Sequence, residues 1–366
     1  MADSEVMAHY LSLADYKVIG LEHEADLMDE ADLIIFNTCT VKNPSDDKFF
    51  SQLNKQDKPL VITGCIPQSV SANLRNSDQG SDFWLNNYSA LGVEQLDAIV
   101  EVVDQTLQGN IVHRLGKGKR LKDRTFLPAL RKNKYISIIP LLQGCLGHCT
   151  YCKTKFARGH LKSYPQESII EQVRSAKAQG IKEVWLVSED NGAYGLDIGT
   201  DFPTLLQELT KIEGSLKIRV GMFNPEYAYK YRNELAEIFK HPLFYRFLHI
   251  PLQAGNNQVL ADMVRPYTVQ EWKEAIRTIR EAIPDMRFAT DIICGFPTEN
   301  GIAFQDTMNL LREVPIDMIN ISKFYARPET KAASMKQLSS KVIKTRSRIL
   351  TRWFEEQNRN KDSVGS

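Results

Sequence analysis

Short apolar runs alternate with amphipathic stretches along most of the chain, and no other feature limits its fold as strongly. Six runs of strand length follow one another at 135–141, 182–188, 217–222, 246–252, 287–293 and 317–324. Apolar residues at helical spacing fill the gaps at 166–179, 201–213, 229–240, 257–263, 269–282 and 301–313. Because strands that alternate with helices pair in parallel, residues 135–338 predict a partial (β/α)6 barrel of the TIM type. Its site is expected at the carboxyl ends of the strands.

The first 107 residues predict a smaller α/β domain. Apolar runs at 31–36, 59–63 and 90–93 predict buried strands, and amphipathic stretches at 6–16 and 92–107 predict helices. Together they predict a small Rossmann-like domain with a parallel sheet. Cys39 and Cys65 each follow a predicted strand, where an open parallel sheet forms its ligand crevice.

The net charge of +1 conceals an uneven distribution. Residues 1–105 contain 18 Asp and Glu against 6 Lys and Arg, whereas residues 111–135 contain nine basic residues and one acid. Residues 108–134 have no apolar period and predict a basic linker, and residues 339–360 predict an amphipathic helix with a basic side, followed by a polar tail to residue 366. Two basic stretches fit a polyanionic partner, nucleic acid first, and a solvated linker and helix face are the alternative.

Composition and length exclude several classes of protein. The chain has no apolar run of about 18 residues, so no membrane segment is predicted. Its first residues lack a secretory pattern, and 6 cysteines among 366 residues are too few for a disulfide scaffold. These observations predict a cytoplasmic protein. Three of the six cysteines lie within eight residues, which favours metal or redox chemistry.

The segment Gly144–Cys152 carries the strongest chemical signal. Cys145, Cys149 and Cys152 lie on one loop after the first predicted barrel strand. Three thiolates at this spacing can each bind a different iron of a 4Fe–4S cube and leave the fourth iron open. S-adenosylmethionine (SAM) can chelate the open iron, and one electron from the cluster then cleaves it to a 5′-deoxyadenosyl radical. A three-cysteine zinc site is the alternative, although such sites usually contain paired Cys-x-x-Cys units and the chain has no second pair.

Beyond this loop, the chain resembles the radical SAM methylthiotransferases, and among them the eukaryotic and archaeal branch that modifies N6-threonylcarbamoyladenosine in tRNA. The resemblance covers nearly the whole chain. Its motifs are Asn37–Asn43, Gly64–Gln68, Gly144–Cys152, Lys153–Gly159, Ser188–Thr200, Arg219–Pro225, His249–Gln253, Thr290–Pro297 and Phe324–Pro328. The stretches Cys152–Lys155 and Ser188–Asp190 indicate this branch rather than the isopentenyladenosine or ribosomal-protein branches.

The resemblance implies a radical reaction on tRNA. In the family, one SAM methylates a sulfur of an auxiliary cluster, a second SAM yields the radical, and a methylthio group is attached to C2 of the modified adenosine next to the anticodon. A radical suits this position because C2 is neither acidic nor nucleophilic. The implied partners are the tRNA anticodon stem-loop and an electron donor such as a flavodoxin-type or reductase protein. Residues 111–135 and 339–360 are the candidates for contacts with the RNA phosphates.

The resemblance also assigns Cys39 and Cys65 to a second 4Fe–4S cluster, the auxiliary one. They match the second and third of three cysteine ligands in the family, and the first is expected just before Asp3, inside a motif that the sequence cuts. The ligand set is therefore incomplete, and we expect a fragment, an alternative isoform or a misassigned start. Without the resemblance, both cysteines fit equally well as small buried hydrophobic residues. The sequence also lacks the C-terminal RNA-binding β-barrel of the family and the endoplasmic-reticulum anchor of some eukaryotic relatives.

Residues of the cluster loop and the strand ends are predicted to contact SAM. They are Tyr151, Ser188, Glu189, Asp190, Asn224, Gln253 and Asp291. For the stretch Ser188–Asp190 a turn or helix-capping role is the alternative, and for the other strand ends ordinary strand-end hydrogen bonding. By resemblance Arg158 lies near the cluster loop, with a surface ion pair as the alternative. Cys294 is predicted to be a core residue, and Glu329 stands where relatives have glycine.

Two further functions remain open at this point. One is a radical SAM methylthiotransferase that acts on a protein side chain, since an acidic N-terminal domain with a net charge of −12 over residues 1–105 also fits a basic protein partner. The other is a non-catalytic or partially active isoform that binds tRNA, which the incomplete ligand set of the auxiliary cluster favours.

Overall fold

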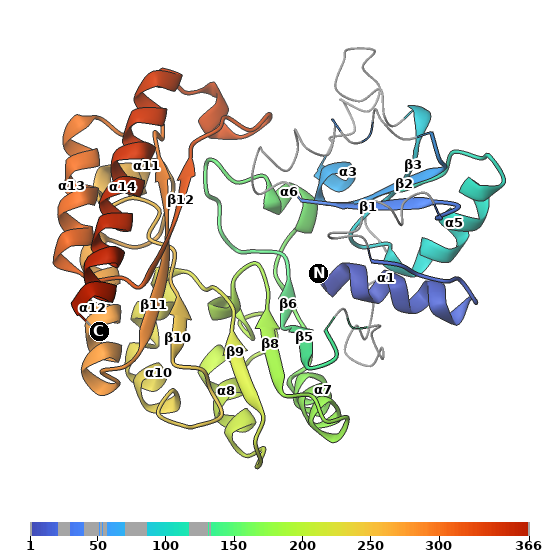
Figure 1. The fold of residues 1–366 in the computed structure, drawn as a ribbon, viewed down its shortest axis with the longest axis horizontal. Helices are drawn as coiled ribbons and strands as arrows, with labels where there is room; N and C mark the ends of the chain where they lie inside the picture. The colour runs from blue at the N-terminus through green and yellow to red at the C-terminus, as the bar shows by residue number, and fades with distance from the viewer. Residues whose placement is uncertain are drawn as a thin grey trace. The chain divides into compact units, whose positions relative to one another are not determined.

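The computed structural model describes residues 2–20, 30–39, 51, 53, 57–69, 86–116, 131 and 133–364. The chain divides into two compact units (Figure 1). Unit 1 comprises Met1–Cys145 and Lys153–Ile181, and unit 2 comprises Leu146–Cys152 and Lys182–Ser366. Most of the predicted basic linker, from 117 to 130, lies outside the described residues.

A four-stranded parallel sheet forms the centre of unit 1. Its strands are β1 (Ile34–Thr38), β2 (Leu60–Gly64), β3 (Ser89–Leu91) and β4 (His113–Arg114), in that order. The predicted parallel sheet is confirmed. Strand β4 was not predicted, because two exposed polar residues in a basic stretch give no strand signal.

Side chains of β2 alternate between two apolar clusters of unit 1, as the period of a strand requires. Val61 packs with helices α1 (Ala2–Leu13) and α5 (Ile99–Leu107), which follows the short turn η3 (Leu96–Ala98). Leu60 and Ile62 pack in the other cluster with Leu53 and Ile66. The sheet is therefore covered on both faces, which explains why β2 is entirely apolar in its first three positions.

The remaining elements of unit 1 lie before and after Cys145 along the chain. It contains strand β5 (Ile136–Pro140), the antiparallel pair β6 (Leu142–Gln143) and β7 (Lys162–Ser163), and helices α3 (Cys65–Ser69), α6 (Thr154–Arg158) and α7 (Gln166–Ala178). The helix α7 agrees with the predicted range 166–179. The β6–β7 pair was not predicted, because two-residue strands are too short to show a period.

Unit 2 repeats a strand–helix pattern with parallel pairing. Its strands are β8 (Glu183–Val187), β9 (Lys217–Val220), β10 (Phe247–His249), β11 (Arg287–Cys294) and β12 (Met318–Lys323). Strand β8 pairs with β9, and β11 lies between β10 and β12. Figure 1 shows α12 (Val269–Ala282), α13 (Gly301–Glu313) and α14 (Ser340–Val364) along one side of the β10–β12 sheet. The predicted α/β fold with parallel strands is confirmed.

Local chemistry explains where the observed elements of unit 2 differ from the predicted ones. The predicted helix at 229–240 is two helices, α9 (Pro225–Lys230) and α10 (Arg232–Ile238), and α9 starts early because Pro225 suits the first helical position. The predicted strand at 246–252 ends at His249, because Pro251 has no N–H to donate. The remaining elements are α8 (Phe202–Thr210), α11 (Asn257–Asp262), and the turns η4 (Asn191–Ala193) and η5 (Lys331–Ser334). Among the described residues, no helix is both long enough and apolar enough to cross a bilayer.

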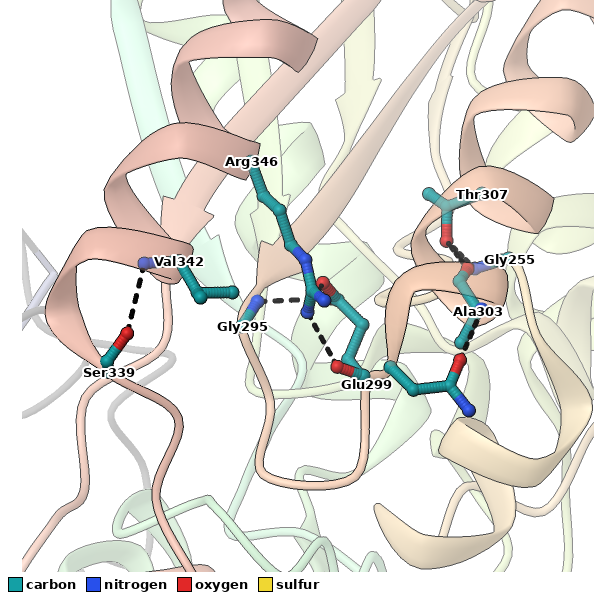
Figure 2. A network of polar contacts seen from close by, with 9 residues as sticks. Gly255, Gly295, Glu299, Ala303, Thr307, Ser339, Val342 and Arg346 are labelled. Carbon is teal, nitrogen blue, oxygen red and sulfur yellow. Dashed lines mark hydrogen bonds and ion pairs between the residues drawn. The ribbon is translucent and has the colours of Figure 1, made fainter.

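A buried ion pair fastens α14 to the loop after β11 (Figure 2). Arg346 donates to a carboxylate oxygen of Glu299 at 2.8 Å and to its backbone carbonyl at 2.6 Å. Glu299 also accepts the backbone N–H of Gly295 at 3.0 Å. A Cβ at Gly295 would lie 2.5 Å from the side chain of Ile343, so α14 packs directly on this glycine. The pair therefore ties the helix to the carboxyl end of β11.

Glu329 occupies a backbone conformation that favours glycine, with φ of +67°. The glycine that the resemblance implies at this position would relieve the strain, since a side chain in the left-handed region costs about 1 kcal/mol or more. We expect Glu329→Gly to raise the free energy of unfolding by about 1 kcal/mol, measured by urea denaturation. Asp15 in unit 1 has a φ of +63°, so we expect a similar rise for Asp15→Gly. If the free energy of unfolding rose at neither position, the strain argument would be contradicted.

Candidate active site

Gly144 sets the backbone that leads into Cys145. Its φ is +83°, and a Cβ there would lie 2.1 Å from the backbone oxygen of His160. The next N–H, that of Cys145, donates to the carbonyl of Gly159 at 3.2 Å. The chain therefore approaches another backbone segment so closely before Cys145 that only glycine fits.

The part of the loop with Cys149 and Cys152 is fixed within unit 2 by backbone bonds. Thr150 donates its N–H to Met263 O at 3.1 Å and its hydroxyl to Asp262 O at 3.0 Å, both at the end of α11. Its own carbonyl accepts from the N–H of Ala332 at 2.9 Å. The N–H of Cys152 donates to Cys149 O at 3.1 Å, a tight turn that brings the two residues close together. None of the three cysteines of the loop forms a disulfide, and all three are partly exposed.

Tyr151, predicted to contact SAM, packs against an aromatic cluster of unit 2. Its ring meets that of Phe296 edge-on at 6.4 Å, and Phe296 meets Phe324 at 5.4 Å. Burial raises the pKa of the Tyr151 hydroxyl well above its usual value, with Arg265 acting in the opposite direction. The ring is therefore a neutral, apolar wall beside the cysteines.

Asp190 and Asn224, both predicted to contact SAM, bind each other. Asp190 is only 2% exposed and accepts from the Asn224 backbone N–H at 3.0 Å and from its side-chain amide at 2.6 Å. Burial raises the pKa of Asp190 to about 7, and the Asn224 bonds limit the rise. These two bonds hold the Asn224 side chain in one orientation. Ser188 donates to the side chain of Asn191 at 2.6 Å, and Glu189 is partly exposed.

Two other predicted residues lie side by side, one after β10 and one within β11. Asp291 was predicted to end a strand, but it is three residues short of the end of β11, because that strand runs on to Cys294. Asp291 accepts from His249 Nε2 at 3.0 Å and from the Asn320 amide at 2.7 Å. Gln253 is 9% exposed, has φ of +72° and donates its N–H to Asp291 O at 2.8 Å. The side chain of Asp291 is 28% exposed, so it is the more accessible of the two to a ligand.

Arg265 is a residue of this site that the sequence analysis did not single out. Its guanidinium donates to the Cys149 sulfur at 2.9 Å, to the Asn224 side-chain oxygen and to the Tyr267 hydroxyl at 3.1 Å. The nearest sequence signal is the placement of Arg265 directly after α11, but nothing in the spacing joins it to a cysteine 116 positions earlier.

In unit 1, Cys39 and Cys65 lie at the same edge of the sheet. They follow β1 and β2, whose last residues, Thr38 and Gly64, are register partners. Cys39 is exposed and Cys65 is buried. Burial raises the pKa of Cys65, and the nearby Arg158 guanidinium, hydrogen-bonded to this thiol, lowers it.

Arg158 is the second basic residue beside a predicted cluster ligand. Its guanidinium pairs with Asp3 at 2.8 Å, and both side chains are largely buried. Its acid partner is therefore buried rather than on the surface, and its thiol partner Cys65 belongs to the predicted auxiliary site. Cys294 has no exposed surface, and burial raises its pKa to about 12, as expected of a core thiol.

Two family models match the chain. The Radical SAM superfamily matches residues 139–311, and the uncharacterized protein family UPF0004 matches residues 1–86. Among solved structures, the radical SAM methyltransferase TsrM from Kitasatospora setae aligns with a TM-score of 0.63 at 14% identity, over 90% of this chain and 70% of that chain. The cobalamin-dependent radical SAM enzyme OxsB aligns with a TM-score of 0.59 at 12% identity, over 91% of this chain and 52% of that one. At such identities the structures show a common fold alone.

Curated relatives are far more similar in sequence. The threonylcarbamoyladenosine tRNA methylthiotransferase of Mus musculus is 42% identical over the whole chain, and this chain spans 62% of that protein. The protein of Drosophila melanogaster is 41% identical, with 65% of its length covered. A probable threonylcarbamoyladenosine tRNA methylthiotransferase of Pyrococcus abyssi is 39% identical over 96% of this chain and 80% of its own length. The chain therefore belongs to the threonylcarbamoyladenosine tRNA methylthiotransferase family.

Proposed function

We propose that this chain is a radical SAM methylthiotransferase that adds a methylthio group to C2 of N6-threonylcarbamoyladenosine next to the anticodon of tRNA. The observation that carries the proposal is the spacing of Cys145, Cys149 and Cys152 in a chain that is 39% identical to an archaeal relative over 80% of its length. The proposal includes a cytoplasmic location and an external one-electron donor of the flavodoxin or reductase type.

The donor set of the loop fits a 4Fe–4S cluster with one open iron. Three partly exposed thiols outside disulfides would leave one iron of a cube without a protein ligand. In unit 1, Cys39 and Cys65 at one sheet edge are two ligands of the proposed auxiliary cluster, and Arg158 and Asp3 surround Cys65. When bound, the two clusters and SAM would supply the radical and the methylated sulfur.

The other residues of the site position and shield these groups. Asp190 and Arg265 hold the two ends of the Asn224 amide in one orientation, and we assign the remaining hydrogen-bonding capacity of this amide to SAM. The Tyr151 ring closes one side with an apolar surface, which excludes water that would quench a radical. Asp291, which binds His249 and Asn320, offers a partly exposed carboxylate within β11. These contacts support a role for each residue in SAM or substrate binding.

A stripe of exposed basic residues on α14 supports an RNA substrate. Lys341, Lys344, Arg348 and Arg352 are all exposed and follow one another at spacings of three or four residues. This spacing places the four side chains on one helix face. Four cations spread over about 16 Å of helix suit successive phosphates of an RNA strand. We call these four residues the basic stripe.

Neutralising the basic stripe is expected to weaken tRNA binding. Changing all four residues to Gln should lower affinity about 10–100-fold at 0.15 M salt and flatten the slope of log K against log salt by about 3. Filter binding over a salt series measures both. The control changes Lys182, Lys217, Lys240 and Arg287 to Gln, since these exposed residues lie near the amino ends of strands. An equal loss in both variants would argue against a specific contact.

Iron and acid-labile sulfide per chain test the proposed clusters directly. For protein reconstituted without oxygen we expect about eight irons, and about four in a Cys145→Ala/Cys149→Ala/Cys152→Ala variant. The variant should also form no 5′-deoxyadenosine from SAM. Cys294→Ala is the matched control, because this core thiol should not change the iron content. Wild-type protein without iron would refute the proposal.

A second measurement identifies the substrate. The wild-type chain is incubated with SAM, a reductant and tRNA that carries threonylcarbamoyladenosine, and nucleosides are analysed by mass spectrometry. We expect the methylthio nucleoside only with this tRNA and not with tRNA that lacks the threonylcarbamoyl group. Methylthiolation of an added ribosomal protein instead would favour the protein-modifying alternative.

A further inference from the structure

Arg265 is a buried cation placed directly against a predicted cluster ligand. The residue is 9% exposed, and its guanidinium cannot lose its proton in a protein. One terminal nitrogen lies 2.9 Å from the Cys149 sulfur. Cysteine binds iron as a thiolate, and with the cluster bound this contact would be a charge-assisted hydrogen bond to the ligand sulfur.

The other nitrogens of Arg265 are bound to groups that are themselves fixed. The second terminal nitrogen donates to Asn224, which is bound twice by buried Asp190. The Nε–H donates to the Tyr267 hydroxyl at 3.1 Å, and that hydroxyl donates to Leu252 O at 2.8 Å. The cation therefore has one orientation, and one continuous chain of hydrogen bonds runs from Cys149 to Asp190.

The backbone directly before Arg265 is strained. Val264 has φ of +56°, which is unfavourable for a β-branched residue. The N–H of Val264 donates to Ala261 O and that of Arg265 to Leu260 O, both at 2.9 Å, so α11 ends in a Schellman turn at a position that glycine normally occupies. Strained backbone of this kind concentrates at functional sites. It turns the chain so that Arg265 meets Cys149.

We propose that Arg265 is a positioning residue for the radical SAM cluster, where its fixed positive charge and its hydrogen bond to the Cys149 sulfur raise the reduction potential of the cluster. The inference rests on the proposed function, because it needs a cluster at Cys145, Cys149 and Cys152. A reduced cluster carries one more negative charge than an oxidised one, so a nearby cation and a donor to sulfur stabilise it. Arg265 also donates to Asn224, so the same guanidinium orients a residue that is proposed to contact SAM.

The test is a redox titration of the cluster followed by electron paramagnetic resonance, without SAM. The parent protein is the full chain with Cys39→Ala and Cys65→Ala, which removes the signal of the proposed auxiliary cluster. At one fixed potential, Arg265→Gln should lower the ratio of reduced to oxidised cluster about tenfold, equal to about 59 mV for one electron. Arg265→Lys keeps the positive charge but not the forked guanidinium donors, so the ratio of reduced to oxidised cluster should fall less than in Arg265→Gln.

Arg232→Gln is the matched control, because Arg232 is a partly buried arginine of unit 2 that pairs with Glu274 and lies over the ring of Tyr229. Arg232→Gln should leave the midpoint reduction potential of the cluster unchanged. Iron content and circular dichroism are measured first for every variant. If Arg265→Gln fails to bind four irons, Tyr267→Phe is measured instead, since it removes the acceptor that orients Nε of Arg265 together with the hydroxyl's bond to Leu252 O. A lowered midpoint potential of the cluster supports the proposal, and an unchanged one overturns it.

The experiment distinguishes failure of the proposed function from failure of the role proposed for Arg265. A parent protein without any reducible cluster would refute the proposed function itself. A parent cluster whose midpoint and spectrum are the same in Arg265→Gln, with four irons in both, would refute the role of Arg265 alone and leave that arginine a structural residue.

Discussion

Replacing Arg346 with methionine is expected to lower the free energy of unfolding by about 3–5 kcal/mol, because it leaves the buried carboxylate of Glu299 without its cation. The side chains of Arg346 and Glu299 are 12% and 4% exposed, so water cannot replace the lost partner. The same change removes the bond from Arg346 to the Glu299 carbonyl. We expect α14 to detach from the loop after β11 before the rest of unit 2 unfolds (Figure 2).

Urea unfolding and amide hydrogen exchange of residues 340–359 measure this effect. The control is Arg348→Met, two positions along the same helix and exposed, which should cost less than about 0.5 kcal/mol. The double variant Arg346→Met/Glu299→Gln should lose less stability than the two single losses combined, since it leaves no unpaired charge. Unchanged exchange of α14 in Arg346→Met would contradict the role of the pair.

The loss in Arg346→Met should depend on pH. Burial raises the pKa of Glu299 above its ordinary value of 4.5, and Arg346 counteracts this rise. Without Arg346 the folded-state pKa rises further. A carboxyl with a raised folded-state pKa contributes stability below about 4.5 that is lost as the pH rises through the folded value. The destabilisation should therefore be smaller near pH 5 than near pH 8, and the opposite trend would contradict the assignment.

Most of the fold could be predicted from the sequence because its helices and strands carry their own signals. The helices at 269–282 and 301–313 agree with α12 and α13 residue for residue, and both begin after a capping side chain, Thr268 and Asn300. The strands and α-helices that were missed are short: β4, β6 and β7 are two residues long, and helices α3 and α6 are five residues long. Their existence depends on neighbours distant in the sequence, which a local pattern cannot show.

The site was predictable in part, for a related reason. The three cysteines of the loop are close in sequence, so their spacing alone indicates a cluster. Asp190 and Asn224 were both predicted to contact SAM, and the sequence could not show that both are buried and bind each other, because it shows that a polar residue ends a strand and not which way it points. Arg158 and Arg265 each approach a cysteine only through folding, and neither has a motif that announces it.

Changing Gly144 to alanine is expected to lower the free energy of unfolding by about 3 kcal/mol or more and to prevent iron binding at the loop. Two costs combine at this position. An alanine with φ of +83° pays about 1–2 kcal/mol for the left-handed conformation. Its Cβ would also lie 2.1 Å from His160 O, so the backbone on one side must move. Because the next residue is Cys145, that movement displaces the first predicted ligand.

Gly109→Ala separates the two costs. Gly109 has the same φ of +83°, but a Cβ there would meet nothing within 4 Å. It should lose only about 1 kcal/mol and keep all its iron. Urea unfolding gives the first quantity and iron analysis after anaerobic reconstitution the second. Equal losses in the two variants would mean that conformation alone matters at Gly144. A larger loss with about four irons missing would instead show that the close approach to His160 is what fixes Cys145 for cluster binding.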